Sequence, residues 1–238
     1  MQLVFDIETD GLYFDATKIW CLVAIDENNK VYSFRENEID KGIELLKSAD
    51  RIIGHNIIGF DIPVIKKLTG VNLHKYTDTL DTLTLSRLMH PTREGGHSLE
   101  TWGWKLNCLK SDKPDFDEFT EQMLEYCIQD VKLNKLVLES LRREAKGFSK
   151  ECIDLEHEVC KILQEQYEIG FLFDEKNAMM LLSSLNKRKA EVEKEVHETF
   201  KPKWVDVKEV IPKLKKDGML SKSGLTNIEY EERVATND

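Results

Sequence analysis

Two acidic side chains lie two positions apart near the start of the chain, where they could share a metal ion. Asp6 and Glu8 belong to a run over residues 3–8 that alternates along the chain, as a β-strand does. Residues two apart on a strand project from the same face, so the two carboxylates repel each other unless a cation lies between them. The turn sequence that follows, from Thr9 to Leu12, places the pair at a strand end, where α/β sheets build sites. An edge strand with a solvated acidic face is the alternative interpretation.

A third carboxylate, Asp61, opens a helix after a run of polar residues that begins at His55. An Asp at a helix N-terminus is also a common cap, so this residue alone indicates little. Farther along, Tyr126 and Asp130 are four residues apart in a periodic helix, and this spacing puts both on one face. That face continues into apolar residues, and a carboxylate among packed side chains needs a partner.

The first half of the sequence predicts the elements that hold these residues. Three β-rich runs separated by turns indicate consecutive antiparallel strands, at residues 3–8, 19–25 and 31–34. An amphipathic stretch over about 38–48 follows, and a short apolar run at 51–54 fits a buried parallel strand that leads into a helix over 60–68. Strands of both kinds with alternating helices predict an α/β fold, a mixed sheet flanked by helices.

The second half of the sequence is mostly helical in pattern. Asp81 can cap a helix that reaches Met89, and Ser98 begins another. Two long periodic helices are expected over about 117–141 and 151–168. The helical pattern breaks at Gly170, resumes after the N-cap candidate Asp174 and continues to about Phe200.

The composition excludes some classes of protein. The chain has 238 residues, with 34 Lys+Arg against 44 Asp+Glu and a formal net charge of −10, which argues against a protein that coats nucleic acid. Hydrophobic residues make up 41%, enough for a sizeable core. The five cysteines include no C-x-x-C pair and are read as reduced packing residues. Neither a membrane span nor a signal peptide is indicated, so we expect a cytoplasmic protein.

Taken together, the acidic segments resemble the three motifs of the 3′–5′ exonucleases of the DnaQ-like superfamily, in the DEDDy subclass whose third motif is Tyr-x-x-x-Asp. Residues 6–12 match the first motif, 56–61 the second and 126–130 the third. The closer likeness is to the proofreading region of bacteriophage family A DNA polymerases, through residues 80–90 and 97–106, between the second and third motifs. This resemblance implies an RNase H-like fold.

The resemblance also implies a mechanism, hydrolysis of the terminal phosphodiester with release of nucleoside 5′-monophosphates. By analogy, Asp6 bridges two divalent metal ions, Glu8 and Asp130 help to hold the one that activates water, and Asp61 binds the other. Oxygen ligands of this kind suit Mg²⁺ or Mn²⁺ better than Zn²⁺. The hydroxyl of Tyr126 orients the nucleophile, because a phenol with a pKa of ~10 is a poor base at pH 7.

Contacts with the substrate follow from the same analogy. The backbone of Thr9 would meet the terminal 3′-hydroxyl, and Leu12 would wedge against the last base, unless Leu12 simply belongs to the core. Asn56 either contacts the substrate or supports the backbone near the site. Trp102 and Trp104 could stack on bases of a frayed strand, although packing is the simpler interpretation.

The likeness continues beyond the exonuclease, since residues 155–174 resemble the helical start of a polymerase portion. We expect an exonuclease domain over 1–148, a helical extension over 149–200 and a basic extension over 201–238. The segments that would form the palm and fingers of a polymerase are absent, so we expect this chain alone not to polymerise.

Three functional hypotheses stay open at this point. The first is a DNA exonuclease acting on single-stranded or frayed 3′ ends, in proofreading or single-strand degradation during phage-type replication in the cytoplasm of a bacterium or infected host. The second is one half of a split or truncated polymerase that mainly docks a separately encoded polymerase part, through an apolar stripe from Ala178 to Val192. The third is an RNA-trimming 3′–5′ exoribonuclease, because related enzymes with the same motifs process RNA. The segments that resemble phage polymerases favour DNA, although no residue identified here distinguishes the two by reading a 2′-hydroxyl.

Overall fold

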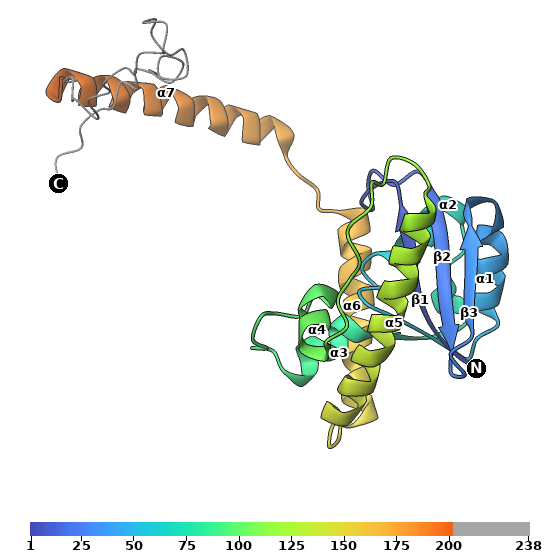
Figure 1. Cartoon of the computed structure of the whole chain (residues 1–238). Helices are drawn as coiled ribbons and strands as arrows, with labels where there is room; N and C mark the ends of the chain where they lie inside the picture. Colours follow the sequence, from blue (N-terminus) through green and yellow to red (C-terminus); the bar gives the residue numbers. More distant parts are fainter. Residues whose placement is uncertain (202–238) are drawn as a thin grey trace, which may run out of the picture. The chain divides into compact units, whose positions relative to one another are not determined.

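The computed structural model describes residues 1–201 of the chain, and a five-stranded mixed sheet forms the core of the unit that ends at Phe171 (Figure 1). Its strands are β1 (Gln2–Thr9), β2 (Ile19–Asp26), β3 (Val31–Arg35), β4 (Arg51–Gly54) and β5 (Asp78–Asp81). In space they follow the order β3-β2-β1-β4-β5, antiparallel from β3 to β1 and parallel from β1 to β5. The mixed α/β class expected from the sequence is confirmed, and β1, with Asp6 and Glu8, is the middle strand.

Helices cover both faces of the sheet. The helices and turns up to Phe171 are α1 (Ile39–Lys47), α2 (Asp61–Thr69), α3 (Thr82–Met89), α4 (Leu99–Leu106), α5 (Glu121–Glu144) and α6 (Lys150–Ile169), with short 3-10 turns η1 (Glu36–Glu38) and η2 (Leu73–Lys75). A further helix, α7 (Glu175–Thr199), follows along the chain. Helix α1 packs on one face of the sheet and α5 on the other (Figure 1). Within residues 1–201, no helix combines the length and the apolar character needed to cross a membrane.

The alternation of β1 directs its side chains to these two layers. Phe5 and Ile7 are buried in the cluster that includes residues of α1 and α2. Val4 is buried on the opposite face, in the cluster that includes residues of α5. Asp6 and Glu8 have the same parity as Val4, so they continue its row toward α5. The strand therefore places two carboxylates next to Val4 on the face of the sheet that α5 covers.

The helix starts follow the capping signals of the sequence. The side chains of Asp81, Ser98 and Asp174 each accept hydrogen bonds from backbone amides in the first turns of α3, α4 and α7, as predicted. The long helix α5 differs, because it begins at Glu121 rather than near residue 117. Thr120 caps it, and the indole of Trp20 donates to the carbonyl of Phe116 at 2.9 Å, which fixes the preceding segment outside the helix.

The chain divides into two compact units after Phe171. Helix α6 belongs to the first unit, where it packs against α3, and it ends at Gly170 with a positive φ of 73°. Helix α7 belongs to the second unit, and the apolar side chains Leu181, Leu182 and Leu185 on it are exposed. The domain limits expected near residues 148 and 200 stay predictions, and residues 202–238 of the expected basic extension lie outside the described residues.

Candidate active site

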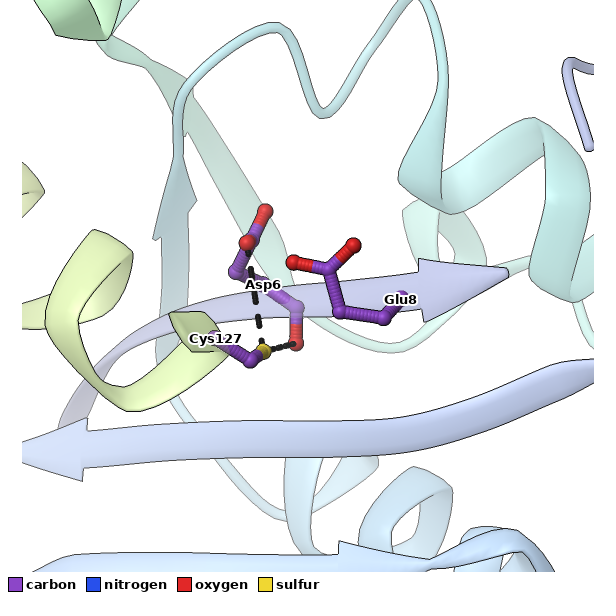
Figure 2. A group of neighbouring side chains, drawn as sticks. All are labelled: Asp6, Glu8 and Cys127. Carbon is purple, nitrogen blue, oxygen red and sulfur yellow. Dashed lines mark hydrogen bonds between the residues drawn. The ribbon is translucent and has the colours of Figure 1, made fainter. Parts of the chain in front are cut away.

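Asp6 and Glu8 lie side by side on the face of β1 that is turned toward α5 (Figure 2). One oxygen of each carboxylate and the thiol of Cys127 lie within 4.8 Å of one another. Burial raises the pKa of Glu8 to about 8, and the charge of Asp130 adds to this shift. Burial and the charges of Asp61 and Glu8 likewise raise the pKa of Asp6 well above its ordinary value. Two carboxylates held this close favour a cation between them.

Asp61 reaches the same place from the first residue of α2. Its Oδ1 accepts a hydrogen bond from the backbone amide of Ile7 at 3.2 Å. Strand β4 pairs with β1 only as far as Val4, so this amide is not used by the parallel ladder. The side chain is 2% exposed, and burial together with the charge of Asp81 raises the pKa of Asp61 to about 7. The first and second acidic segments thus meet through a direct hydrogen bond.

Asp130 and Tyr126 complete the group from α5, where the spacing of four puts them on one face. Oδ2 of Asp130 lies 2.6 Å from Nζ of Lys110. Its other oxygen, Oδ1, is buried and has no hydrogen-bond partner among the residues that the structure describes. The ammonium group of Lys110 also lies 4.7 Å from the centre of the Tyr126 ring. The pKa of Tyr126 is raised above its ordinary value, mainly by burial and also by the charges of Asp130 and Glu8.

These side chains fit divalent cations. Four carboxylates from three segments repel one another, and Oδ1 of Asp130 is a buried acceptor that a cation would satisfy. The donor set is oxygen, which suits Mg²⁺ or Mn²⁺. The thiol of Cys127 is different, because burial raises its pKa well above the ordinary value and Sγ donates to the backbone carbonyl of Asp6 at 3.6 Å (Figure 2). It is a packed thiol, as expected.

The residues expected to meet the substrate lie on the turns beside this group. Leu12 is 75% exposed, so the interpretation that it belongs to the core is wrong. The hydroxyl of Thr9 donates to the carbonyl of Gly11 at 2.8 Å and shapes the turn after β1. Asn56 has a left-handed backbone with φ of 67°, and its backbone N–H donates to Oδ1 of Asp81 at 3.0 Å. The assignment of these three residues to substrate binding stays a prediction.

Sequence reasoning missed Lys110, which is the basic side chain nearest to Asp130. It lies in the irregular segment between α4 and α5, together with Lys113. These two lysines line a hollow of about 550 Å³ with Tyr126 and Trp104. Trp104 is 66% exposed, whereas Trp102 is 2% exposed and its indole donates to the hydroxyl of Ser86 at 3.2 Å. The two tryptophans therefore differ, since Trp102 packs and Trp104 faces the hollow.

The sheet order, the flanking helices and the carboxylates at the end of β1 define an RNase H-like α/β domain. In agreement, residues 3–106 match the family model described as the RNase_H superfamily.

In sequence, the chain is related to the DNA-directed DNA polymerase of Escherichia phage T7, with 28% identity over 261 residues. The match covers 84% of this chain and 37% of the polymerase, so the chain spans little more than a third of that relative.

Two solved structures illustrate the likeness in fold. Brucella melitensis NrnC with bound Mg²⁺ superposes with a TM-score of 0.54 and 16% identity, over 73% of this chain and 90% of that one. The POL domain of Pol1 from M. smegmatis, in complex with DNA primer-template and dNTP, superposes with a TM-score of 0.59 and 11% identity. That match covers 92% of this chain and 39% of the other. At these identities the structures show a common fold.

Proposed function

We propose that this chain is a metal-dependent 3′–5′ exodeoxyribonuclease that releases nucleoside 5′-monophosphates from DNA ends. The observation that carries the proposal is the closeness of four carboxylates: Asp6 and Glu8 lie together on β1, Asp61 bonds to the amide of the residue between them, and the charge of Asp130 acts on both. Tyr126 lies beside Asp130 on α5. The sequence relation to a phage DNA polymerase supports a DNA substrate. The role in the cell would be proofreading or single-strand degradation, with a separately encoded polymerase part as a partner.

In this proposal, Asp6, Glu8 and Asp130 hold one divalent cation, and Asp6 and Asp61 hold a second, as Mg²⁺ or Mn²⁺. When bound there, such cations would neutralise the four carboxylates and supply Lewis-acid stabilisation for the displacement at phosphorus. Tyr126 is neutral at pH 7, because burial raises its pKa further above the usual value. Its hydroxyl therefore orients the attacking water by a hydrogen bond and does not act as a general base.

The strand end would approach along the turns that follow β1 and β4. In this proposal the backbone of Thr9, the last residue of β1, contacts the terminal 3′-hydroxyl, and the exposed side chain of Leu12 separates the last base from its neighbour. Asn56 lies on the second of these turns, next to the segment that carries Asp61. The net charge of −10 fits an enzyme that binds an end and releases it, rather than one that coats a strand.

A gel assay of single-stranded DNA labelled at its 5′ end or its 3′ end tests the proposal. With Mg²⁺ we expect a ladder that shortens from the 3′ end and mononucleotides as the product, and with EDTA we expect no cleavage. Asp6→Ala should be inactive under the same conditions. Cleavage in EDTA, or shortening from the 5′ end, would refute the proposal, and an RNA strand of the same sequence measures the preference for DNA.

The exposed apolar side chains of α7 favour a second candidate function, docking of a polymerase part. Of the expected stripe, Ala178 is half-buried, and the other four side chains are exposed: Leu181, Leu182, Leu185 and Val192. Light scattering of the isolated chain tests this candidate, because a soluble monomer argues against an obligate docking half. A chain that associates through this stripe should become monomeric when two of the leucines are replaced by glutamate.

A further inference from the structure

A buried histidine on α6 accepts a hydrogen bond from the last residue of β5. His157 is 3% exposed, and its Nε2 lies 2.8 Å from the backbone nitrogen of Asp81. Its Nδ1 lies 2.8 Å from the carbonyl oxygen of Ile153. An amide can only donate and a carbonyl can only accept, so both partners require the neutral tautomer with the proton on Nδ1. His157, on α6, therefore holds the backbone of Asp81 at the end of β5.

The carboxylate of Asp81 is held by four backbone amides. Two belong to α3, which Asp81 caps: the amides of Leu83 and Thr84 donate to Oδ1 at 2.9 and 3.3 Å. The other two come from the turn after β4, where the amide of Asn56 donates to Oδ1 and that of Ile58 to Oδ2, each at 3.0 Å. The side chain is 1% exposed, so these bonds lie away from water, where they stabilise the charge most.

The turn held in this way leads directly to Asp61. Asn56 is left-handed, and its carbonyl accepts from the amides of Gly59 and Phe60 at 3.0 and 2.9 Å, which closes the turn. Phe60, the residue before α2, gives no side-chain cap to the helix. The position of Asp61, the first residue of α2, therefore depends on the turn and on the two amides that Asp81 binds.

We infer that Asp81 and His157 are positioning residues that set the divalent-cation affinity of Asp61 through the turn of residues 55–60. His157 fixes Asp81, Asp81 binds the amides of Asn56 and Ile58, and the turn orients the carboxylate of Asp61. Helix α6, which lies outside the residues matched by the RNase_H model, thus becomes part of the support of the site. The inference rests on the proposed function, since it takes Asp61 as a ligand of a divalent cation.

The test measures metal binding by the full chain without DNA, as the rise in Tm during a titration with Mn²⁺. His157→Leu removes the acceptor and keeps an apolar volume, and we expect the half-saturating Mn²⁺ concentration to rise ~10-fold or more, the usual effect of losing a partner behind a ligand. His157→Gln can present an amide oxygen to the same backbone N–H and should restore most of the affinity. Ile153→Ala is the control, because this side chain lies on the same helix and packs in an apolar cluster, and the substitution keeps the backbone carbonyl that binds His157.

The comparison separates positioning from simple stability. Ile153→Ala should lower Tm and leave the half-saturating Mn²⁺ concentration unchanged. If His157→Leu also lowers Tm without changing that concentration, the inference is overturned. Should the leucine variant fail to fold, Asp81→Asn decides instead, because its amide nitrogen would replace the acceptor opposite the amide of Ile58. An unchanged Mn²⁺ affinity in Asp81→Asn would overturn the inference as well.

The design also keeps the two proposals apart. The titration contains no DNA, so a wild-type chain that binds Mn²⁺ but leaves DNA intact would refute the proposed nuclease while the variants still decide the positioning role. At saturating Mn²⁺ we expect His157→Leu to recover most of the wild-type kcat, because the carboxylates themselves are unchanged. A kcat that stays low at saturating metal, with normal Mn²⁺ affinity, contradicts a role in cation affinity.

Discussion

The ammonium group of Lys110 lies 2.6 Å from one oxygen of Asp130, while the other oxygen of that carboxylate is buried without a partner in the described part of the chain. Burial lowers the pKa of Lys110, but Asp130 more than offsets this effect, so the lysine is charged at neutral pH. A divalent cation bound by Asp130 would lie close to the ammonium group of Lys110, and the two positive charges would repel each other. Lys110 and the cation should therefore compete for the same carboxylate.

Replacing Lys110 by methionine tests this competition. Without the ammonium group, the negative charge of Asp130 is no longer shared with a second cation, so we expect Lys110→Met to lower the half-saturating Mn²⁺ concentration several-fold. In EDTA the same change should lower stability by about 2 kcal/mol, because the buried carboxylate loses a charged hydrogen bond. Thermal unfolding with and without Mn²⁺ measures both effects.

The control for this experiment is Lys132→Met, because Lys132 is an exposed lysine on the same helix as Asp130. It removes the same charge from the chain and should leave the Mn²⁺ titration unchanged. Equal titrations for wild type and Lys110→Met would show that the contact with Asp130 does not compete with metal binding.

Tyr126→Phe should retain partial activity. The substitution removes only the hydroxyl that orients water, and the four carboxylates stay in place, so we expect a loss on the order of 10–100-fold, as for other groups that act beside a metal ligand. Single-turnover rates of 3′-end cleavage give this number, with Asp6→Ala as the inactive reference. Equally complete loss of activity in both variants would argue against an orienting role for the hydroxyl.

The raised pKa values predict how the metal-free chain responds to pH. Glu8 has a pKa of about 8 and Asp61 of about 7, so each carboxyl binds a proton more tightly in the folded chain than in the unfolded one. Each therefore contributes stability at low pH that is lost as the pH rises toward 8, about 1.4 kcal/mol for every unit of pKa difference. In EDTA we expect Glu8→Gln to flatten the fall in Tm between about pH 5 and pH 8.

Divalent cations should reverse this trend. They replace the protons of the carboxyl groups, so saturating Mg²⁺ should stabilise the chain more at pH 8 than at pH 6, and binding should release protons. Calorimetry in buffers of different ionisation enthalpy counts the released protons.

For the metal-free chain, a Glu8→Gln variant whose Tm depends on pH as steeply as that of the wild type would contradict the raised pKa of Glu8.

The two tryptophans of α4 should behave differently on substitution. Trp104 lines the hollow next to Tyr126, and stacking on a base is worth ~1–3 kcal/mol, so Trp104→Ala should raise KM for single-stranded DNA and leave Tm nearly unchanged. Trp102 is buried, so Trp102→Ala should cost about 3–5 kcal/mol of stability. An unchanged KM in Trp104→Ala would exclude the hollow from the path of the strand.

Local patterns in the sequence predicted most of the fold. The alternation of β1, the apolar run of β4 and the caps at Asp81, Ser98 and Asp174 depend on neighbouring residues, and all are confirmed. Strand β5 was not predicted, because its four residues, Asp-Thr-Leu-Asp, alternate weakly and form a strand only by pairing with β4. The start of α5 was placed too early because the bond between Trp20 and Phe116 joins residues 96 positions apart.

In the candidate site, too, features that depend on local spacing were predicted from the sequence, and contacts between distant segments were not. Asp6 and Glu8, or Tyr126 and Asp130, have a spacing that a strand or a helix converts into one face, so each pair could be named from sequence. The bond between Asp61 and the amide of Ile7 depends on where β4 stops pairing with β1, which no local pattern reveals. Lys110 approaches Asp130 across an irregular segment, and its role had no signal in the sequence beyond its charge.

The order of the acidic segments along the chain has a consequence for biosynthesis. Asp6, Glu8 and Asp61 leave the ribosome early, whereas Asp130 arrives only with α5, which must pack on β1 and β2 before the fourth carboxylate is in place. Domains fold as units once their sequence has emerged, so a nascent chain holds three separated acids and no assembled centre. The complete set of four carboxylates therefore exists only after α5 has emerged and packed on the sheet.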